Sequence, residues 1–223
     1  MGSLLQPDEA QIFLWGMRLA VLFICLPVHE FAHAWAAYKL GDDTAAQQGR
    51  LTLNPFVHLD IFGGILLLFA GFGWAKPVPV DVRVFKHPRR DMAIVAAAGP
   101  LANIIMSIIM MSVAKIVVHT AHVGSAFPMA GAVQVLSAML FINLALAVFN
   151  LLPVPPLDGS KLFGALLPER YYFGMMRYER LVLPVLFLLI FTGWLSRVII
   201  GLSSQLFAFI DIITRPIDLI LGG

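Results

Sequence analysis

The residues of this 223-residue chain that most directly indicate chemistry are His29, Glu30 and His33, which form an H-E-x-x-H motif within an apolar stretch. Residues four apart lie almost above one another on a helix, so both imidazoles can face one metal ion. Glu30 lies about 100° further round the helix, where it can act on a water molecule bound to that metal. This arrangement is typical of zinc hydrolases.

The apolar surroundings of the motif strengthen this interpretation. An ionisable group in the middle of a bilayer costs on the order of 3 kcal/mol and usually marks a functional site. A chance match, or histidines that merely bond polar neighbours, is therefore a weaker explanation here than in a soluble chain. We expect His29 and His33 to bind a metal ion.

A catalytic zinc needs three protein ligands and one open position for water, so a third ligand must come from elsewhere in the chain. Asp158 is the strongest candidate, because it follows the proline-rich segment 153–156. Prolines end a helix, and irregular backbone at membrane depth is tolerated where it lines a polar cavity. Gly159 is expected to permit a sharp turn that aims the carboxylate inward.

Cys25 is an alternative third ligand, because it lies one turn before His29 and a thiolate binds zinc well. Pro27 disturbs the helix between them, however, and three ligands on consecutive turns of one helix do not easily converge on one ion. A lone cysteine in an apolar helix is more often a small hydrophobic side chain. Asp158 is therefore the favoured ligand.

The composition predicts an all-α, polytopic integral membrane protein with a single domain over residues 1–223. Hydrophobic residues make up 60% of the chain and charged residues 13%, which is more apolar than a soluble domain of this length can bury. The lipid bilayer is thus an expected partner. The net charge of +2 gives no reason to expect a nucleic-acid partner.

The apolar stretches divide into spans and shorter segments. A spanning helix needs about 20 residues, and the stretches that meet this length are 12–40, 92–118, 132–152 and 181–202. The run 61–73 is shorter and glycine-rich, so we expect a re-entrant segment. Residues 205–221 carry polar residues on one face and Pro216, which predicts an interfacial helix interrupted at the proline.

The distribution of lysine and arginine predicts the orientation, because these residues concentrate in cytoplasmic loops. Two loops are basic: Lys39, Arg50, Lys76, Arg83, Lys86, Arg89 and Arg90 lie in the first, and Lys161, Arg170, Arg177 and Arg180 in the second. Residues 116–152 contain none. We therefore expect a cell-membrane protein with its N-terminus outside and its active site near the cytoplasmic face.

Three motifs together resemble the site-2 protease family of intramembrane zinc metalloproteases: HEFAH at 29–33, GPLAN at 99–103 and NLLPVPPLDG at 150–159. Segments 50–60 and 73–80 are similar to the short bacterial and archaeal members. The resemblance covers residues 12–165 and leaves no room for a PDZ or CBS domain. Ile61 and Gly64 depart from the proline and threonine that short members often carry.

The resemblance implies one Zn²⁺ per chain, held by His29, His33 and Asp158, with Glu30 as general base. The implied activity is endopeptidase cleavage of membrane-spanning protein substrates. Asn150 is expected either to donate a hydrogen bond to the oxyanion or substrate backbone, or to form a structural bond between helices.

Further residues are expected to bind substrate or to support the site. The glycine-rich run resembles the family's membrane-embedded β-hairpin, whose edge could pair with an unwound substrate strand. Asn103 is as suited to an interhelical bond as to a catalytic role, and Asn143 to a structural one. The substrate-binding or supporting set is Asn103, Gly63, Gly64 and Pro153; His58 and Asp60 are expected to orient the run that follows them.

A membrane metal-ion transporter is the alternative function, because intramembrane histidine and aspartate residues also line ion pathways. A transporter is expected to spread its ligands along a path to both sides of the membrane. The outer halves of the predicted spans show no such ligands, so the protease interpretation is favoured.

Overall fold

The computed structural model describes residues 8–71, 73–120, 127–168 and 179–221. Every regular element in these ranges is a helix, which confirms the predicted all-α class for the described part of the chain. The initial residues 1–7 and the basic-loop residues Arg170 and Arg177 lie outside the described ranges.

The first span is one continuous helical path with a π-helical turn in its middle. It comprises α1 (Glu9–Ala20), the π-helix η1 (Val21–Cys25) and α2 (Leu26–Lys39). Within the π-turn, the Leu26 N–H bonds to the carbonyl of Val21, five residues back. Pro27 follows at once, and its ring has no N–H and would clash with the carbonyl four residues earlier. The widened turn accommodates the proline and places the histidine motif in regular helix.

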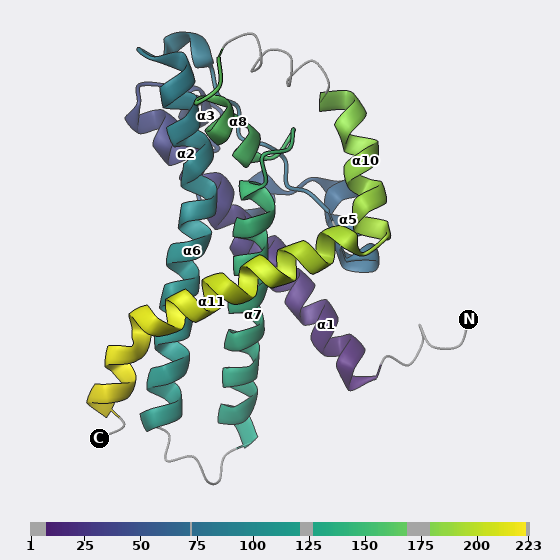
Figure 1. Cartoon of the computed structure of the whole chain (residues 1–223), viewed down its shortest axis with the longest axis vertical. Helices are drawn as coiled ribbons and strands as arrows, with labels where there is room; N and C mark the ends of the chain where they lie inside the picture. Colours follow the sequence, from purple (N-terminus) through teal and green to yellow (C-terminus); the bar gives the residue numbers. More distant parts are fainter. Residues whose placement is uncertain (1–7, 72, 121–126, 169–178, 222–223) are drawn as a thin grey trace.

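Two long helices follow, and α2 packs against the first of them. α6 (Pro88–Thr120) runs back along the molecule, and α7 (Phe127–Leu151) returns beside it (Figure 1). The ranges Gln11–Lys39, Pro88–Thr120 and Gly131–Leu151 have the length and hydropathy to cross a membrane. These three helices coincide with three of the four predicted spans.

The fourth predicted span, 181–202, is wrong in its position. α10 (Glu179–Phe191) ends within it, and α11 (Trp194–Leu221) begins after a break at Gly193, whose φ is +71°. Glycine adopts this left-handed conformation readily and commonly ends helices. α11 is the fourth helix that is long and apolar enough to span. An average of hydropathy over the apolar run does not detect a change of direction at one glycine.

The C-terminal segment is not a separate helix interrupted at Pro216. Residues 205–221 form the second part of α11, which continues through the proline. Membrane helices tolerate proline because neighbouring groups can satisfy the carbonyl that it leaves free. α11 crosses α6 and α7 obliquely and packs on both (Figure 1).

The run 61–73 does not form the β-hairpin that the resemblance suggested, because Ile61–Ala70 form the ten-residue helix α5; its re-entrant path stays a prediction. Asp60 caps its start by accepting the Gly63 N–H at 2.8 Å, which agrees with the expected orienting role. Gly71, at φ +81°, ends it, and Arg18 of α1 donates to carbonyls of its last turn. Ten residues span about 15 Å, half of the apolar core of a bilayer.

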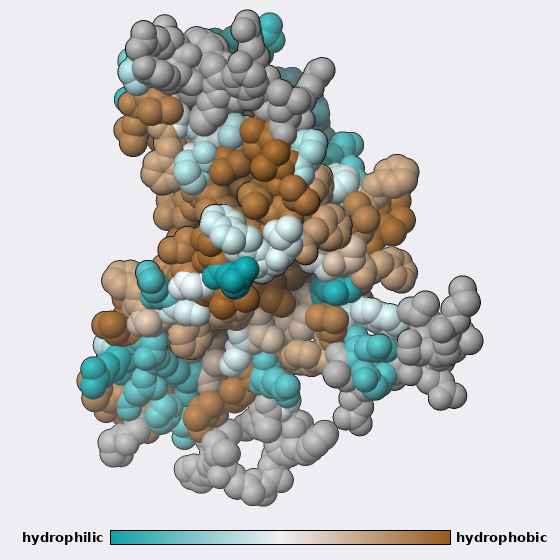
Figure 2. All heavy atoms as spheres, turned by 45° about the vertical axis from the view of Figure 1, so that its right-hand side comes forward, coloured by the Kyte–Doolittle hydropathy of each residue, from teal (hydrophilic) through white to brown (hydrophobic). Residues whose placement is uncertain are grey.

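The short helices α3 and α8 lie at the end of the molecule where α2 ends and α6 begins (Figure 1), whereas α4 contacts α2 and η1. The bounds of the short elements are Thr44–Gln47 for α3, Pro55–His58 for α4, Val82–Val84 for the 3₁₀ helix η2 and Asp158–Gly164 for α8. Apolar side chains cover most of the visible middle of the molecule (Figure 2). This distribution suits a protein surrounded by lipid.

An ionic cluster joins α6 to α11 at the other end of the molecule. Lys115 Nζ lies 2.8 Å from Asp211 Oδ1 and 2.5 Å from Asp218 Oδ2, and the lysine side chain is only 12% exposed. Both carboxylates come from α11 and the ammonium from α6. The cluster therefore fixes the distal half of α11 against α6.

Replacing Lys115 with glutamine is expected to lower the free energy of unfolding by about 1–2 kcal/mol, because it leaves two carboxylates without their cation. Thermal unfolding in detergent measures the change. In a chain that already carries Asp211→Asn and Asp218→Asn, the same lysine substitution should cost much less. Equal costs in the two backgrounds would contradict the ionic interpretation.

Candidate functional site

The structure brings together His29, His33 and Asp158, which lie far apart in the sequence. The two Nε2 atoms are 3.0 Å apart, and Asp158 Oδ2 lies 3.2 Å from that of His29 and 3.1 Å from that of His33. All three residues are buried. Within the described ranges, this is the group of three histidine, cysteine or acidic residues that could hold a metal ion.

The tautomer of His33 follows from its second partner. Its Nδ1 lies 2.7 Å from the backbone carbonyl of Val95 in α6, and a carbonyl can only accept a hydrogen bond. Nδ1 therefore carries the proton, and in the neutral ring Nε2 presents its lone pair to the cluster. Metal-binding histidines are usually oriented by such a bond at the other ring nitrogen.

Gly99 makes room for both imidazoles where α6 packs against α2. A Cβ atom at this position would lie 2.6 Å from His29 Cε1 and closer still to His33 Nε2. No residue larger than glycine fits without moving the rings. The glycine of the GPLAN motif thus shapes one wall of the cluster.

Asp158 opens α8, immediately after the irregular segment that follows α7. A Cβ at Gly159 would overlap the carbonyl groups of Leu151 and Leu152, so glycine is needed for close packing; its φ is not positive, and the expected sharp turn is not the reason.

The cluster has the dimensions of a zinc site. An ion about 2 Å from each ligand of a tetrahedral site places those ligands about 3.3 Å apart, and the three distances here are 3.0, 3.1 and 3.2 Å. The donors are two imidazole nitrogens and one carboxylate oxygen, which all bind zinc. Three electron-pair donors that converge in a buried place favour a divalent cation between them.

Glu30 lies on the same turn of α2 as the histidines but has a different partner. Its Oε2 accepts the backbone N–H of Val78 at 3.2 Å. Unlike the three buried residues of the cluster, Glu30 is partly exposed. It is therefore reachable from outside the cluster.

Two of the three asparagine side chains form structural hydrogen bonds in this structure. Asn150 Nδ2 donates to the Leu146 carbonyl of its own helix at 3.0 Å. Asn143 Nδ2 donates across helices to the Asn103 carbonyl at 2.7 Å, as expected of a structural residue. The side-chain amide of Asn103 is fully buried and has no hydrogen-bond partner within the described residues.

The other residues singled out in the sequence contact neighbours outside the cluster. Gly63 packs against the Trp74 carbonyl, and Gly64 lies against the side chains of Leu59 and Leu22. Cys25 is buried in the π-turn and does not belong to the metal-ligating group. His58 donates from Nε2 to the Thr52 carbonyl at 2.8 Å, which orders the loop before α5.

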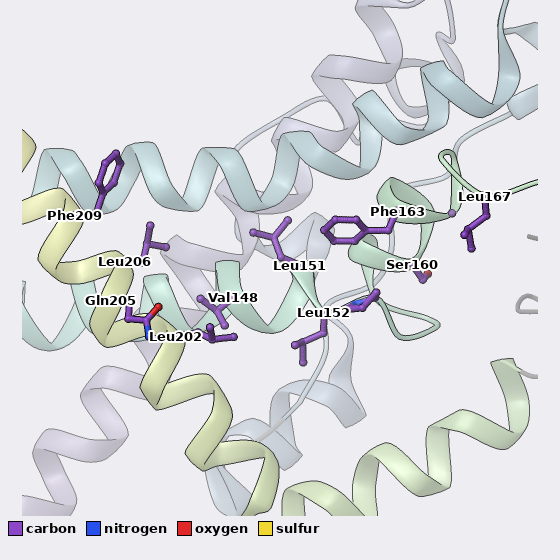
Figure 3. A pocket seen from close by; sticks show the side chains of 12 residues that line it. Val148, Leu151, Leu152, Ser160, Phe163, Leu167, Leu202, Gln205, Leu206 and Phe209 are labelled. Atoms are coloured by element: carbon purple, nitrogen blue, oxygen red, sulfur yellow. The ribbon is translucent and has the colours of Figure 1, made fainter.

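An apolar hollow adjoins the helix that carries Asp158 (Figure 3). Its volume is about 780 Å³, and it lies between the end of α7, α8 and α11. Pro153 belongs to its wall, and Ser160, two residues after Asp158, lines it as well. The remaining lining residues are Val148, Leu151, Leu152, Phe163, Gly164, Leu167, Leu202, Gln205, Leu206 and Phe209.

Sequence reasoning missed three contacts of the site. Val95 acts through its backbone carbonyl, so its side chain gives no signal. Gly99 stood out in the sequence only as part of the GPLAN motif, which gives no sign of its contact with the histidines. The bond between Val78 and Glu30 joins segments 48 residues apart, and the prolines on either side of Val78 were the one local sign that its N–H is unusual.

Gly99→Ala is expected to lower zinc bound per purified chain at least tenfold, because the added methyl group displaces both imidazoles. Gly201→Ala is the matched control, since a Cβ there meets nothing within 4 Å. Elemental analysis of both proteins measures the effect. Full zinc in Gly99→Ala would show that the rings lie elsewhere.

Comparisons with known proteins agree with this geometry. The family model described as Peptidase family M50 matches residues 112–193. YwhC of Bacillus subtilis, named as a candidate zinc metalloprotease, is 48% identical over 148 residues, or 66% of this chain and 67% of YwhC. Rip2 of Mycobacterium tuberculosis H37Rv, named likewise, is 29% identical over 229 residues, or 96% of this chain and 85% of Rip2.

A more distant relative is the zinc metalloprotease MJ0392 of Methanocaldococcus jannaschii. It is 24% identical over 200 residues, which cover 87% of this chain and 48% of that protein. No solved structure matches the chain. With its span-length apolar helices and its similarity to YwhC and Rip2, this multi-pass membrane protein belongs to peptidase family M50.

Proposed function

We propose that the chain is an intramembrane zinc endopeptidase that hydrolyses peptide bonds within or near the membrane-spanning segments of other proteins. The observation that carries this proposal is the convergence of His29, His33 and Asp158 at one buried point. The distances suit zinc, and the helix that supplies both histidines also supplies a carboxylate.

The residues divide the chemistry between them. His29, His33 and Asp158 would hold one Zn²⁺, which supplies a Lewis acid and a lowered pKa for water. Glu30 removes the proton from the attacking water and delivers it to the leaving amine. Asn150 would have to leave its bond with Leu146 to donate to the oxyanion or to the substrate backbone.

The substrate class follows from the surroundings of the cluster. An apolar segment can lie against the hollow beside α8, whose lining is almost entirely aliphatic or aromatic. A peptide bond in such a segment is shielded by helical hydrogen bonds and must be unwound before water attacks it. Residues 152–157 lie between α7 and α8 without helical structure and are the irregular backbone that immediately precedes Asp158.

A metal transporter is the less suitable function. The described ionisable residues at the far end of the molecule include Lys115, His119, Asp211 and Asp218, and the Lys115 ammonium already lies between the two carboxylates. A pathway for cations needs acceptor groups that are free to bind them. Among the described residues, the cluster of His29, His33 and Asp158 is such a group, and it lies at a single depth and not along a path.

Asp158→Ala is expected to lose most of the bound zinc, whereas Glu30→Gln keeps it and loses at least a thousandfold in cleavage rate. Zinc per chain and cleavage of a membrane-spanning substrate in proteoliposomes test both. A chelator should abolish wild-type cleavage, and added zinc should restore it. Cleavage by Glu30→Gln at the wild-type rate would refute the proposal.

The proposed orientation places the basic loop and the active site near the cytoplasmic face of the cell membrane. In a Cys25→Ala background, Lys86→Cys is expected to react with an impermeant maleimide only after the cells are opened. Thr120→Cys, at the opposite end of α6, should react in intact cells. Both positions are exposed in the structure. The reverse pattern would place the active site outside.

A further inference from the structure

Residues 74–81, here termed the strap, run without regular secondary structure between α5 and η2. The strap reaches α2 at the H-E-x-x-H turn, where the Val78 N–H donates to Glu30 Oε2 at 3.2 Å. Glu30 is 48 residues earlier in the chain. A backbone group of the strap thus contacts the proposed general base.

The sequence of the strap makes this donor unusual. Pro77 and Pro79 flank Val78, and proline has no N–H. Val78 therefore carries the one backbone donor of the three consecutive residues, and that donor bonds to a carboxylate. Hydrogen bonds to charged groups are roughly twice as strong as those between neutral groups.

Contacts on both sides fix the strap. Before Val78, the Lys76 N–H donates to the His58 carbonyl at 2.8 Å. After it, the Asp81 N–H donates to the buried carboxylate of Asp42 at 2.8 Å. Ala75 packs with Val21, Leu22 and Leu26, and Val80 packs with Ala36 and Ala37, so both contact the first span.

Arg50 is the main side-chain support of the strap. It is 5% exposed, and its guanidinium donates to the Val57 carbonyl and, at 3.3 Å, to that of Pro77. The Pro77 carbonyl belongs to the same peptide unit as the Val78 N–H. Arg50 therefore holds that peptide plane from one side while Glu30 bonds it on the other.

We propose that the strap positions the general base: the Val78 N–H fixes Glu30 Oε2 and leaves Oε1 for proton transfer, and Arg50 is the positioning residue that holds the strap in place. The inference rests on the proposed function, since it assumes that Glu30 is the base. A glutamate side chain has several rotatable bonds, and a fixed donor selects one arrangement before substrate binds.

Val78→Pro tests the inference because it removes the N–H and adds no polar group. We expect kcat to fall at least tenfold, with KM within twofold of wild type and zinc per chain unchanged. Val78→Ala keeps the N–H and should retain at least a third of wild-type kcat. A chain with the α-hydroxy acid analogue of valine at position 78, which replaces the N–H by oxygen without a proline ring, should behave like Val78→Pro.

Arg50 gives a second, independent readout. Arg50→Gln should lower kcat at least tenfold with zinc retained, and Arg50→Lys should recover part of the loss because it keeps a donor for the Pro77 carbonyl. Arg197→Gln, an exposed arginine on α11, is the matched control and should leave kcat unchanged. Equal losses in Arg50→Lys and Arg50→Gln would oppose a positioning role through that carbonyl.

The results separate this inference from the proposed function. If wild type does not cleave, or Glu30→Gln does, the proposed function itself fails. If those controls behave as expected but Val78→Pro and the variant with the α-hydroxy acid at position 78 keep wild-type kcat, the strap does not position Glu30. Loss of zinc in these variants would also overturn it, because the strap would then support the metal cluster and not the base.

Discussion

The structure depends on holding three electron-pair donors at one point in an apolar interior. Two come from one turn of α2 and the third from α8, 129 residues after His29. Polar groups buried without partners cost several kcal/mol, so the cluster persists only where the surrounding helices leave its donors no other position. Gly99 and Gly159 serve this purpose, since each lets a backbone approach where any side chain would intervene.

α6 connects the elements that form the site. It packs against α2, α7, α8 and α11, and its Val95 carbonyl orients His33. Between membrane helices, where lipid weakens the hydrophobic driving force, close packing of small residues and polar contacts hold the helices together. α6 uses both: Gly99 lies directly against the two histidine rings, and Lys115 bonds α11 at the other end.

The grouping of His29, His33 and Asp158 was more predictable from the sequence than the contacts that support it. A histidine pair at i and i+4 shares a face of any helix, so His29 and His33 follow from local geometry alone. Asp158 followed from the need for a third ligand and from the proline-rich segment that precedes it. The break at Gly193 and the helix at 61–70 were mispredicted, because the first depends on one backbone angle and the second on capping by Asp60 and Arg18, which hydropathy does not measure. The bond from Val78 to Glu30 depends on long-range packing and had no local periodicity to reveal it.

Backbone groups orient side chains of the site, and there is a physical reason why they are well suited to do so. The Val95 carbonyl fixes the tautomer of one proposed ligand, and the Val78 N–H fixes one oxygen of the proposed base. A backbone dipole held in a helix or between prolines has already lost its conformational freedom on folding, so it needs no further ordering when substrate binds. Electrostatic groups that are fixed beforehand are also the most effective in catalysis. A site that must work beside lipid, with few water molecules to stabilise charge, gains most from supports of this kind.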